Sequence, residues 1–348
     1  MFVRGIVADE ILNEIMRQRE EKLQALDAQG MNPFHVTEYR RTHRAKEILD
    51  NFEAMETQTV KVAGRVMSRR GQGKVTFMHL QDASGQIQAF FRFDDVGAEA
   101  YERLKLVDIG DILGVEGYVF KTRTEEISIH VAKFEVLTKA LRPLPEKWHG
   151  LKDMETRYRQ RYVDLIVNPE VRDTFAMRSR TVKAIRTLLD GKGFLEVETP
   201  MMQAIPGGAA ARPFITHHNA LDIDLYLRVA PELYLKRLIV GGLEQVYEIN
   251  RNFRNEGIDT RHNPEFTMLE VYEAYANYQD MMRLSEEIFA AAAMATRGTL
   301  QLTYQGMEVD LTPPWQRISM FDALREFGGV DTSKLMDFES AKELCRAM

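Results

Sequence analysis

The sequence has almost no cysteine, no long apolar run and no excess of positive charge, and each absence excludes a class of protein. Its one cysteine, Cys345, excludes an internal disulfide and a metal site built from several cysteines, and favours a reducing, cytoplasmic setting. No apolar run approaches the roughly 20 residues of a membrane-spanning helix, so no membrane association is expected. The 46 Lys and Arg against 52 Asp and Glu give a net charge of −6, so a nucleic acid would have to meet a local basic patch.

The first part of the chain has the pattern of helices followed by a small β-barrel. Apolar residues at helical spacing (Ile11, Ile15, Leu23 and Leu26) predict a helix over Glu10–Ala28. The basic cluster Arg40–Lys46 either opens a second helix with a solvated face or faces RNA. From residue 59 to 139 the pattern predicts three strands, a helix and two strands, typical of a five-stranded oligonucleotide-binding (OB) barrel, although other small barrels share it.

A linker and a second, mixed domain follow the barrel. Two prolines between Ala140 and Gly150 indicate the linker, and Asn168-Pro169-Glu170 is typical of a helix start. Two long strands, Val246–Glu256 and Glu265–Ala274, are expected around a loop. The predicted fold class is therefore α+β, divided into an N-terminal helical segment (1–58), the barrel (59–139), a linker (140–160) and an antiparallel sheet domain flanked by helices (161–348).

The two long strands carry the residues that point to chemistry. With a period of two, one face of the pair carries Glu248, Asn250, Asn252, Arg254 and Glu256 from the first strand, and Phe266, Glu270 and Tyr272 from the second. One interpretation is a wet polar face whose surface ion pairs contribute little. The other is a ligand site, because charges within a sheet are costly unless they are paired or used for recognition.

A nucleotide suits the second interpretation. The arginine would contact phosphate oxygens, the Phe266 ring would stack on a base, and Glu256 would accept a hydrogen bond from an exocyclic amino group. The sequence contains neither G-x-x-x-x-G-K-[ST] nor a G-x-G-x-x-G between a strand and a helix. We therefore expect ATP, if it binds, to bind on the face of an antiparallel sheet.

The motifs around this hairpin resemble those of class II lysyl-tRNA synthetases of the bacterial type. Residues 193–200 (GFLEVETP) resemble the first class II signature, whose proline lies at the dimer interface. Residues 253–257 (FRNEG) and 261–266 (RHNPEF) resemble the second, an ATP-binding hairpin, and residues 205–214 and 230–236 resemble the lysyl branch. The resemblance covers residues 12–348, makes the last domain the catalytic one, and implies a homodimer that binds ATP, Mg²⁺, L-lysine and tRNA(Lys).

The resemblance also implies a role for each matching residue of the second domain. Arg254 would contact the α-phosphate and stabilise charge during the attack. Adenine would be recognised by Glu256 and Phe266, and the nucleotide would be contacted from the loop by His262 and Asn263. The amino-acid pocket would consist of Gly208, Glu232, Glu270 and Tyr272, with the acids neutralising ammonium groups. For Glu232, the alternative is an acid that complements the dipole of the helix it opens.

The barrel resembles the anticodon-binding domain of this family. Phe77 would stack on a base, unless it belongs to the barrel core, and Arg69, Gln88 and Glu126 would read base edges.

One signature of the family is missing. The third class II signature, a glycine-rich strand and helix with an arginine for the γ-phosphate, does not occur, nor do the later acids that hold Mg²⁺. We therefore expect a chain that is truncated at its C-terminal end, with an incomplete catalytic sheet. Two alternatives to a lysine–tRNA ligase remain: a non-catalytic tRNA-binding fragment, and a paralogous ligase that lysylates a protein, although such relatives generally lack the barrel.

Overall fold

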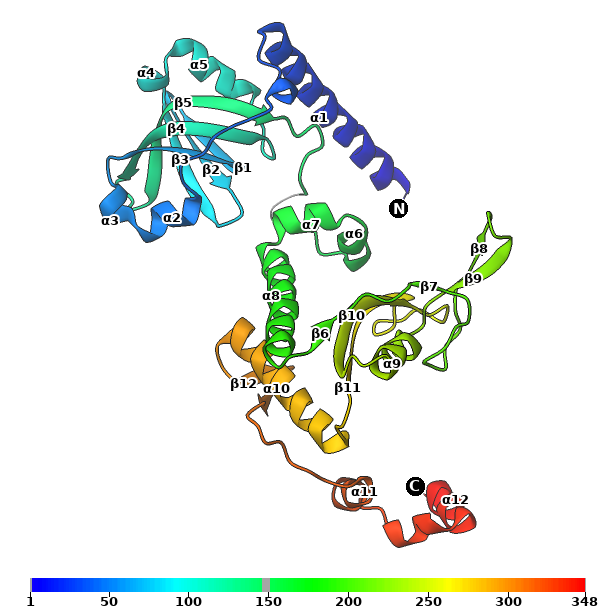
Figure 1. The fold of residues 1–348 in the computed structure, drawn as a ribbon. Helices are drawn as coiled ribbons and strands as arrows, with labels where there is room; N and C mark the ends of the chain where they lie inside the picture. The colour runs from blue at the N-terminus through cyan, green and yellow to red at the C-terminus, as the bar shows by residue number, and fades with distance from the viewer. Residues whose placement is uncertain (1, 146–150, 348) are drawn as a thin grey trace. The chain divides into compact units, whose positions relative to one another are not determined.

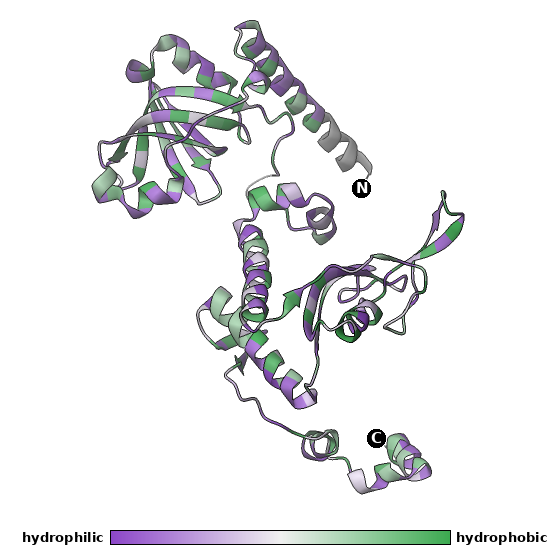
Figure 2. Ribbon diagram, viewed as in Figure 1, coloured by the Kyte–Doolittle hydropathy of each residue, from purple (hydrophilic) through white to green (hydrophobic). Residues whose placement is uncertain are grey.

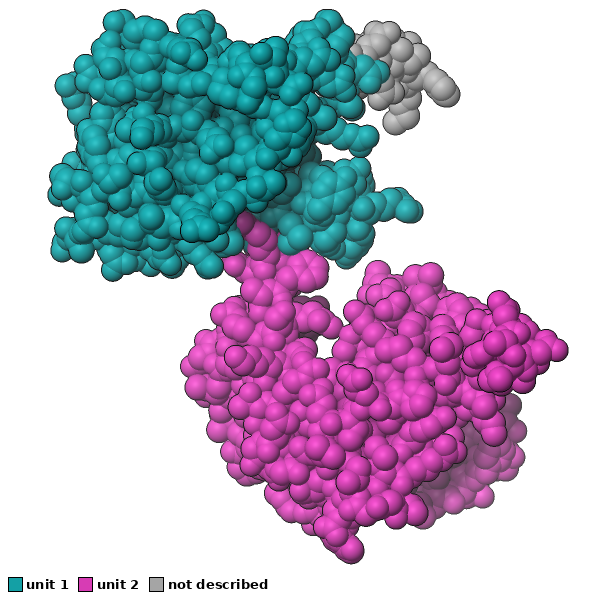
Figure 3. Space-filling model, turned by 45° about the horizontal axis from the view of Figure 1, so that its top comes forward, with its two compact units in different colours: residues 1–169 teal, residues 170–348 magenta. Residues whose placement is uncertain are grey.

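A computed structural model describes residues 2–145 and 151–347 (Figure 1), with side chains from residue 11 onward. The chain forms two compact units, Met1–Pro169 and Glu170–Met348 (Figure 3). Residues 146–150 of the expected linker lie outside the described residues. Within the described residues, every helix is too short or too polar to cross a membrane.

The first unit is built around a closed five-stranded barrel, as predicted. Its strands follow the order β1-β2-β3-β5-β4 around the barrel. They are β1 (Thr59–Gln72), β2 (Val75–Gln81), β3 (Gln86–Arg92), β4 (Ile112–Lys121) and β5 (Ile127–Thr138). The helices before the barrel are α1 (Phe2–Ala28), η1 (Pro33–His35), α2 (Ala45–Asp50) and α3 (Phe52–Met55). Between β3 and β4 lie α4 (Phe93–Val96), α5 (Ala98–Arg103) and η2 (Leu104–Leu106), and after the barrel come α6 (Met154–Arg159) and α7 (Arg161–Val167).

Alternating side chains explain why these residues close into a barrel. On β2, Met78 and Leu80 are buried inside, while the alternating Phe77 and His79 are only half-buried on the outer face. Figure 2 shows the same alternation of hydrophobic and hydrophilic residues along the barrel strands. Gly117 is required where β4 meets β5, because a Cβ there would lie 2.0 Å from the carbonyl oxygen of His130.

Helix α1 attaches to the barrel differently from the prediction. Ile11 is 56% exposed, so the predicted apolar face does not extend along the helix, and only its Leu26 end is fully buried. Polar contacts hold it instead: the Arg19 guanidinium donates to the carbonyl of Ile109 at 3.0 Å, and Lys22 pairs with Asp108 at 2.5 Å. The basic cluster does not open a helix at Arg40, since α2 begins only at Ala45.

The second unit contains the predicted pair of long strands within a three-stranded sheet of order β11-β10-β6. Its strands are β6 (Leu195–Glu196), β10 (Gln245–Phe253) and β11 (Glu265–Glu273); β10 ends at Phe253, three residues before the predicted Glu256, because the chain turns there into the hairpin loop. Helices α8 (Pro169–Gly191) and α10 (Tyr278–Arg297) cover one face, where Leu189, Tyr247 and Leu284 form a common core.

Shorter elements surround this sheet. A small sheet of order β7-β9-β8 consists of β7 (Met202–Gln203), β8 (Ile215–His218) and β9 (Ile223–Leu227), and is followed by α9 (Glu232–Val240). The predicted last strands form a hairpin, β12 (Gln301–Tyr304) and β13 (Met307–Asp310). Then come α11 (Met320–Gly328), η3 (Thr332–Met336) and α12 (Phe338–Ala347).

Candidate functional site

The face of the β10–β11 pair opposite α8 and α10 is polar, and its residues on β10 are buried. Glu248 lies opposite Glu270 and Asn252 lies opposite Phe266, so the residues predicted to share a face do share it. Glu248 is 3% exposed, Asn250 is 7% exposed and Asn252 is fully buried. A wet surface with weak ion pairs does not describe this face.

Arg254 continues this face just beyond the end of β10. Its backbone N–H donates to the Pro264 carbonyl at 2.8 Å, which keeps the two chains paired for one further step. Its guanidinium carbon lies 5.1 Å from the centre of the Phe266 ring, a cation–π contact. The sequence-based pairing of a phosphate-binding arginine with a stacking ring is therefore present in the geometry.

Several polar atoms on this face have no partner among the described residues. They are the Nε atom of Arg254, the Nδ2 atom of Asn250 and the Oδ1 atom of Asn252. Buried polar groups in native proteins are almost always hydrogen-bonded, to protein or to water or ligand. A polar ligand lying along β10 would satisfy these atoms.

Acidic residues gather at the other end of the face. Burial, followed by the neighbouring carboxylates of Glu232 and Glu248, raises the pKa of Glu270, against the opposing effects of the Tyr272 hydroxyl and Arg228. The Tyr272 hydroxyl donates to Glu270 at 3.1 Å. Burial, followed by the carboxylates of Glu270 and Glu232, raises the pKa of Tyr272 as well. The excess of negative charge is suited to a cationic ligand.

A buried ion pair supports this acidic group, and the sequence did not single it out. Arg228 Nη1 donates to Glu248 Oε1 at 2.7 Å, and the Thr199 hydroxyl donates to Glu248 Oε2 at 2.7 Å. Arg228 Nε also donates to the Arg251 carbonyl at 2.9 Å, which ties it to β10. A single arginine within the otherwise apolar residues 225–230 was the signal that could have revealed a buried charge.

Gly208 lies directly beside Glu232. Its φ of +90° is in the region that favours glycine, and a Cβ there would be 3.0 Å from the Cβ of Glu232. Glu232 opens helix α9 and forms an ion pair with Lys236 one turn later. Its position is therefore compatible both with the pocket role and with the helix-dipole role that the sequence left open.

The remaining predicted ATP-binding residues lie at the hairpin loop. Glu256 accepts a hydrogen bond from the backbone N–H of Arg212 at 3.3 Å. The exposed His262 ring pairs with Asp259 at 2.8 Å, and Asn263 is exposed next to it. These side chains lie on the rim, beyond the buried face.

On the barrel, three of the four predicted residues come together on the outer face and one does not. Phe77 is half-buried outside the barrel, with its ring 5.0 Å from the Phe90 ring, so it does not belong to the core. Gln88 donates to Glu126 at 2.6 Å. Arg69 lies opposite the inward-facing Met78, and its guanidinium donates to the Val107 carbonyl at 2.7 Å, away from this group.

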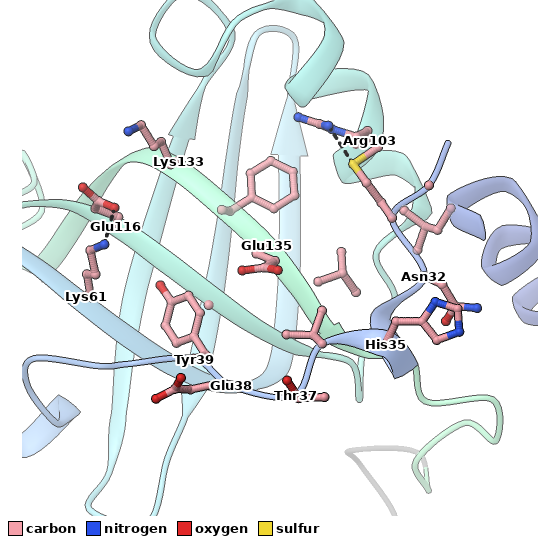
Figure 4. Close-up of a pocket in the computed structure, with 17 residues that line it drawn as sticks. Asn32, His35, Thr37, Glu38, Tyr39, Lys61, Arg103, Glu116, Lys133 and Glu135 are labelled. Carbon is pink, nitrogen blue, oxygen red and sulfur yellow. Dashed lines mark hydrogen bonds and ion pairs between the residues drawn. The ribbon is translucent and has the colours of Figure 1, made fainter. Parts of the chain in front are cut away.

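A separate cavity of about 730 Å³ lies between residues 26–39 and strands β4 and β5 (Figure 4). Burial, with the carboxylates of Glu116 and Glu135, raises the pKa of the Tyr39 hydroxyl to about 12. The charged residues that line the cavity include Lys61 and Glu116, which form an ion pair at 3.0 Å. None of the residues predicted to bind a ligand lines this cavity.

Comparisons with known proteins assign both regions to families. Residues 153–343 match the tRNA synthetases class II (D, K and N), and residues 60–137 match the OB-fold nucleic acid binding domain. A protein named lysine–tRNA ligase from Pelotomaculum thermopropionicum is 62% identical over 96% of this chain and 66% of its own length. Proteins of the same name from Carboxydothermus hydrogenoformans and Syntrophomonas wolfei are 61% and 58% identical, over 96% and 95% of this chain and 69% and 67% of theirs. The chain thus spans about two thirds of the length of these relatives.

Proposed function

The chain belongs to the class II tRNA synthetases (D, K and N), and from this premise we propose that it is part of a lysine–tRNA ligase. In the first step of the proposed reaction, the lysine carboxylate attacks the α-phosphorus of ATP and releases pyrophosphate. In the second, a terminal ribose hydroxyl of tRNA(Lys) attacks the carbonyl of the lysyl-adenylate. The two alternatives, a non-catalytic fragment and a protein-lysylating paralogue, receive no support from the comparisons.

The observation that carries this proposal is the polar face of β10 and β11. It offers an arginine over an aromatic ring, unpartnered polar atoms along β10 and a cluster of acids at the far end. A ligand with a base, a phosphate and an amino acid that carries two ammonium groups matches these three features in order. Lysyl-adenylate is such a ligand.

The proposed roles of individual residues follow this order. Arg254 contacts the α-phosphate and stabilises the charge that builds up during the attack. Phe266 and Glu256 hold the adenine, and His262 and Asn263 contact the nucleotide from the rim. The lysine pocket consists of Gly208, Glu232, Glu270 and Tyr272. An uncharged analogue of lysine would bind poorly there, because the carboxylates of the pocket would have no cationic partner. Catalysis then consists mainly of positioning and charge stabilisation.

The barrel is proposed to bind the anticodon of tRNA(Lys), and the protein to act as a homodimer in the cytoplasm, where translation takes place. We retain the division into residues 1–58, 59–139, 140–160 and 161–348 as a proposal. The exposed Leu195, Met201 and Met202 around the first signature supply apolar surface for the dimer contact.

The described residues contain no group of three or more His, Cys, Asp or Glu side chains placed to hold a metal ion. We therefore assign no step to the metal, although the family resemblance implies it together with ATP.

Lysine-dependent exchange between ATP and pyrophosphate tests the proposal. The full-length protein that carries this chain is assayed with lysine, with aspartate and without amino acid. We expect exchange with lysine alone. No exchange with lysine, or equal exchange with aspartate, would refute the assignment.

A further inference from the structure

A continuous row of hydrogen bonds crosses the outer face of the barrel at His79, a residue that no predicted role uses. The His79 Nε2 atom lies 2.7 Å from Glu126 Oε1, and its Nδ1 atom lies 2.7 Å from the Ser68 hydroxyl. The other Glu126 oxygen accepts from Gln88 Nε2 at 2.6 Å, and Gln88 Oε1 accepts from the Ser128 hydroxyl at 3.0 Å. Side chains from four strands are thereby joined to one carboxylate.

The hydrogen bonds of this row determine which atom of each side chain donates and which atom accepts. An ionised carboxylate only accepts hydrogen bonds, so a neutral His79 carries its proton on Nε2 and its Nδ1 accepts from Ser68. Gln88 must direct its amide nitrogen towards Glu126 and its carbonyl towards Ser128. Since both ends of Gln88 are engaged and the residue is only 3% exposed, Gln88 holds Glu126 and offers little surface to a base.

Glu126 is the member of the row that a ligand can reach. Its side chain is 40% exposed, against 24% for His79. Glu126 lies in the turn between β4 and β5, and two hydrogen bonds to Thr122 close this turn. The Glu126 backbone carbonyl accepts from the Thr122 backbone N–H, and the Glu126 backbone N–H donates to the Thr122 hydroxyl. A glutamate on such a turn would sample several rotamers if it were not held by two N–H donors.

The Phe77 ring lies on the same outer face as His79, two residues earlier on β2. Phe77 pairs with Phe90 in the register of β2 and β3, and His79 pairs with Gln88 two residues further on. The face thus places a ring for stacking next to a fixed hydrogen-bond acceptor. This combination suits an unpaired base whose edge presents an N–H, such as the N3–H of uracil.

We propose that His79 is a positioning residue for anticodon recognition: it holds the Glu126 carboxylate in the orientation that accepts an N–H from a base stacked near Phe77. The proposal rests on the proposed function, because it takes the bound RNA to be an anticodon loop. Because His79 already fixes the Glu126 side chain, Glu126 loses less conformational entropy when the base binds. It should therefore affect discrimination between bases, and not only overall affinity.

The experiment measures binding of this chain to an RNA stem-loop with the lysine anticodon UUU, and to three loops in which one uracil is replaced by cytosine. Cytosine presents a lone pair at N3, which repels a carboxylate, and carries its N–H donor at N4 instead, so the loss of affinity on replacement reports how firmly Glu126 is held opposite N3. We expect one position to show a preference for uracil of about tenfold or more. His79→Leu should reduce that preference to about twofold, whereas His79→Gln, which retains an N–H donor, should keep most of it.

Three further variants, Glu126→Gln, His79→Leu/Glu126→Gln and His35→Leu, separate positioning from structure. In His79→Leu/Glu126→Gln, discrimination should be no weaker than in Glu126→Gln alone, because the two residues act through one contact. His35→Leu changes an exposed histidine of the same unit away from this face and should leave discrimination unchanged.

The outcomes distinguish this proposal from the function on which it rests. If the unchanged chain binds none of the stem-loops, the anticodon-binding role of the barrel fails and the inference fails with it. If the chain prefers uracil and His79→Leu keeps the full preference, His79 does not position Glu126, while the anticodon-binding role stands. Equal losses in His79→Leu and His79→Gln would also overturn the proposal, because the N–H donor would then be irrelevant.

Discussion

The two binding faces of this chain differ in how completely the protein satisfies its own polar groups. On the outer face of the barrel, Glu126 is held by partners on either side. On the β10–β11 face, Asn250, Asn252 and Arg254 each keep a buried polar atom without a partner in the described residues. The first face is preorganised before any ligand arrives, whereas the second leaves hydrogen bonds for the ligand to complete.

The hydrophobic cores beneath the two faces differ in size, and the core of the barrel is the larger one. The barrel encloses a cluster of buried apolar residues that extends from Leu26 to Val136, while the described core behind β10 consists of Leu189, Phe194, Tyr247 and Leu284, with half-buried residues around it. A larger core can tolerate an exposed recognition face. The sheet site instead combines a smaller core with mutually repelling acids, so ligand binding should contribute more to its stability.

The largest expected effect concerns the barrel core. Phe91 is fully buried and packs edge-on against Phe134, with 5.6 Å between ring centres. Phe91→Ala should lower the free energy of unfolding of the first unit by about 3–5 kcal/mol, through lost apolar burial and the cavity left behind. Urea unfolding followed by circular dichroism, together with stem-loop binding, measures the loss. The control Phe327→Ala removes a ring that is 72% exposed and should change stability by less than about 0.5 kcal/mol.

The next effect concerns the charge that the sheet face offers to phosphate. Arg254→Ala should reduce lysine-dependent exchange in the full-length protein by about 10²–10³-fold, the usual cost of removing one donor to a developing charge. Arg251→Ala is a matched control, because Arg251 lies three residues earlier, on β10, is half exposed and pairs with Glu265 at 3.6 Å. A near-normal rate for Arg254→Ala would remove its proposed role.

Substitution of Glu270 tests how much the acidic cluster lowers the stability of the fold. Because its pKa is raised in the folded state, the folded chain binds more protons than the unfolded chain above pH 4.5. This carboxyl therefore makes the fold less stable as pH rises from 4.5 through its raised pKa. Glu270→Gln should raise the melting temperature by about 1–3 °C at pH 7.5 and by less near pH 4.5, while weakening lysine binding at least tenfold.

The control for this variant is Glu265→Gln. Glu265 lies on the same strand but is mostly exposed, and its partner Arg251 also faces solvent. It should change neither the melting temperature nor lysine binding by a measurable amount. A lower melting temperature for Glu270→Gln at pH 7.5 would show that the acids are already compensated within the fold.

The part of the fold that could be predicted from sequence is the part with a strong local period. The strand pairs β2–β3 and β10–β11 run without a register shift, so their faces, and the side shared by Arg254 and Phe266, follow from a period of two. Strands β8 and β9 could not be predicted this way, because exposed residues such as Ile215 and Ile223 show no buried side.

The candidate site contains contacts that no spacing reveals. The ion pair between Arg228 and Glu248 joins the residue after β9 to β10, and the approach of Gly208 to Glu232 joins a loop to a helix start. Likewise, Arg69 was predicted with the other barrel residues, but the register shift between Val66 and Ser68 pairs it with an inward-facing residue. Such features depend on tertiary packing and on bulges, which a single sequence does not specify locally.

The smallest expected effect separates backbone strain from crowding at the lysine pocket. Gly208 and Gly242 both have positive φ, +90° and +96°, but a Cβ at Gly208 would press on Glu232, whereas at Gly242 it would meet open space. Alanine at either position should cost about 1–2 kcal/mol of stability through backbone strain. Only Gly208→Ala should also displace Glu232 and weaken lysine binding, by about 3–10-fold, as measured by calorimetry on the full-length protein. An equal loss of affinity in Gly242→Ala would mean that strain alone reaches the pocket, and the contact between Gly208 and Glu232 would then have no separate role in binding.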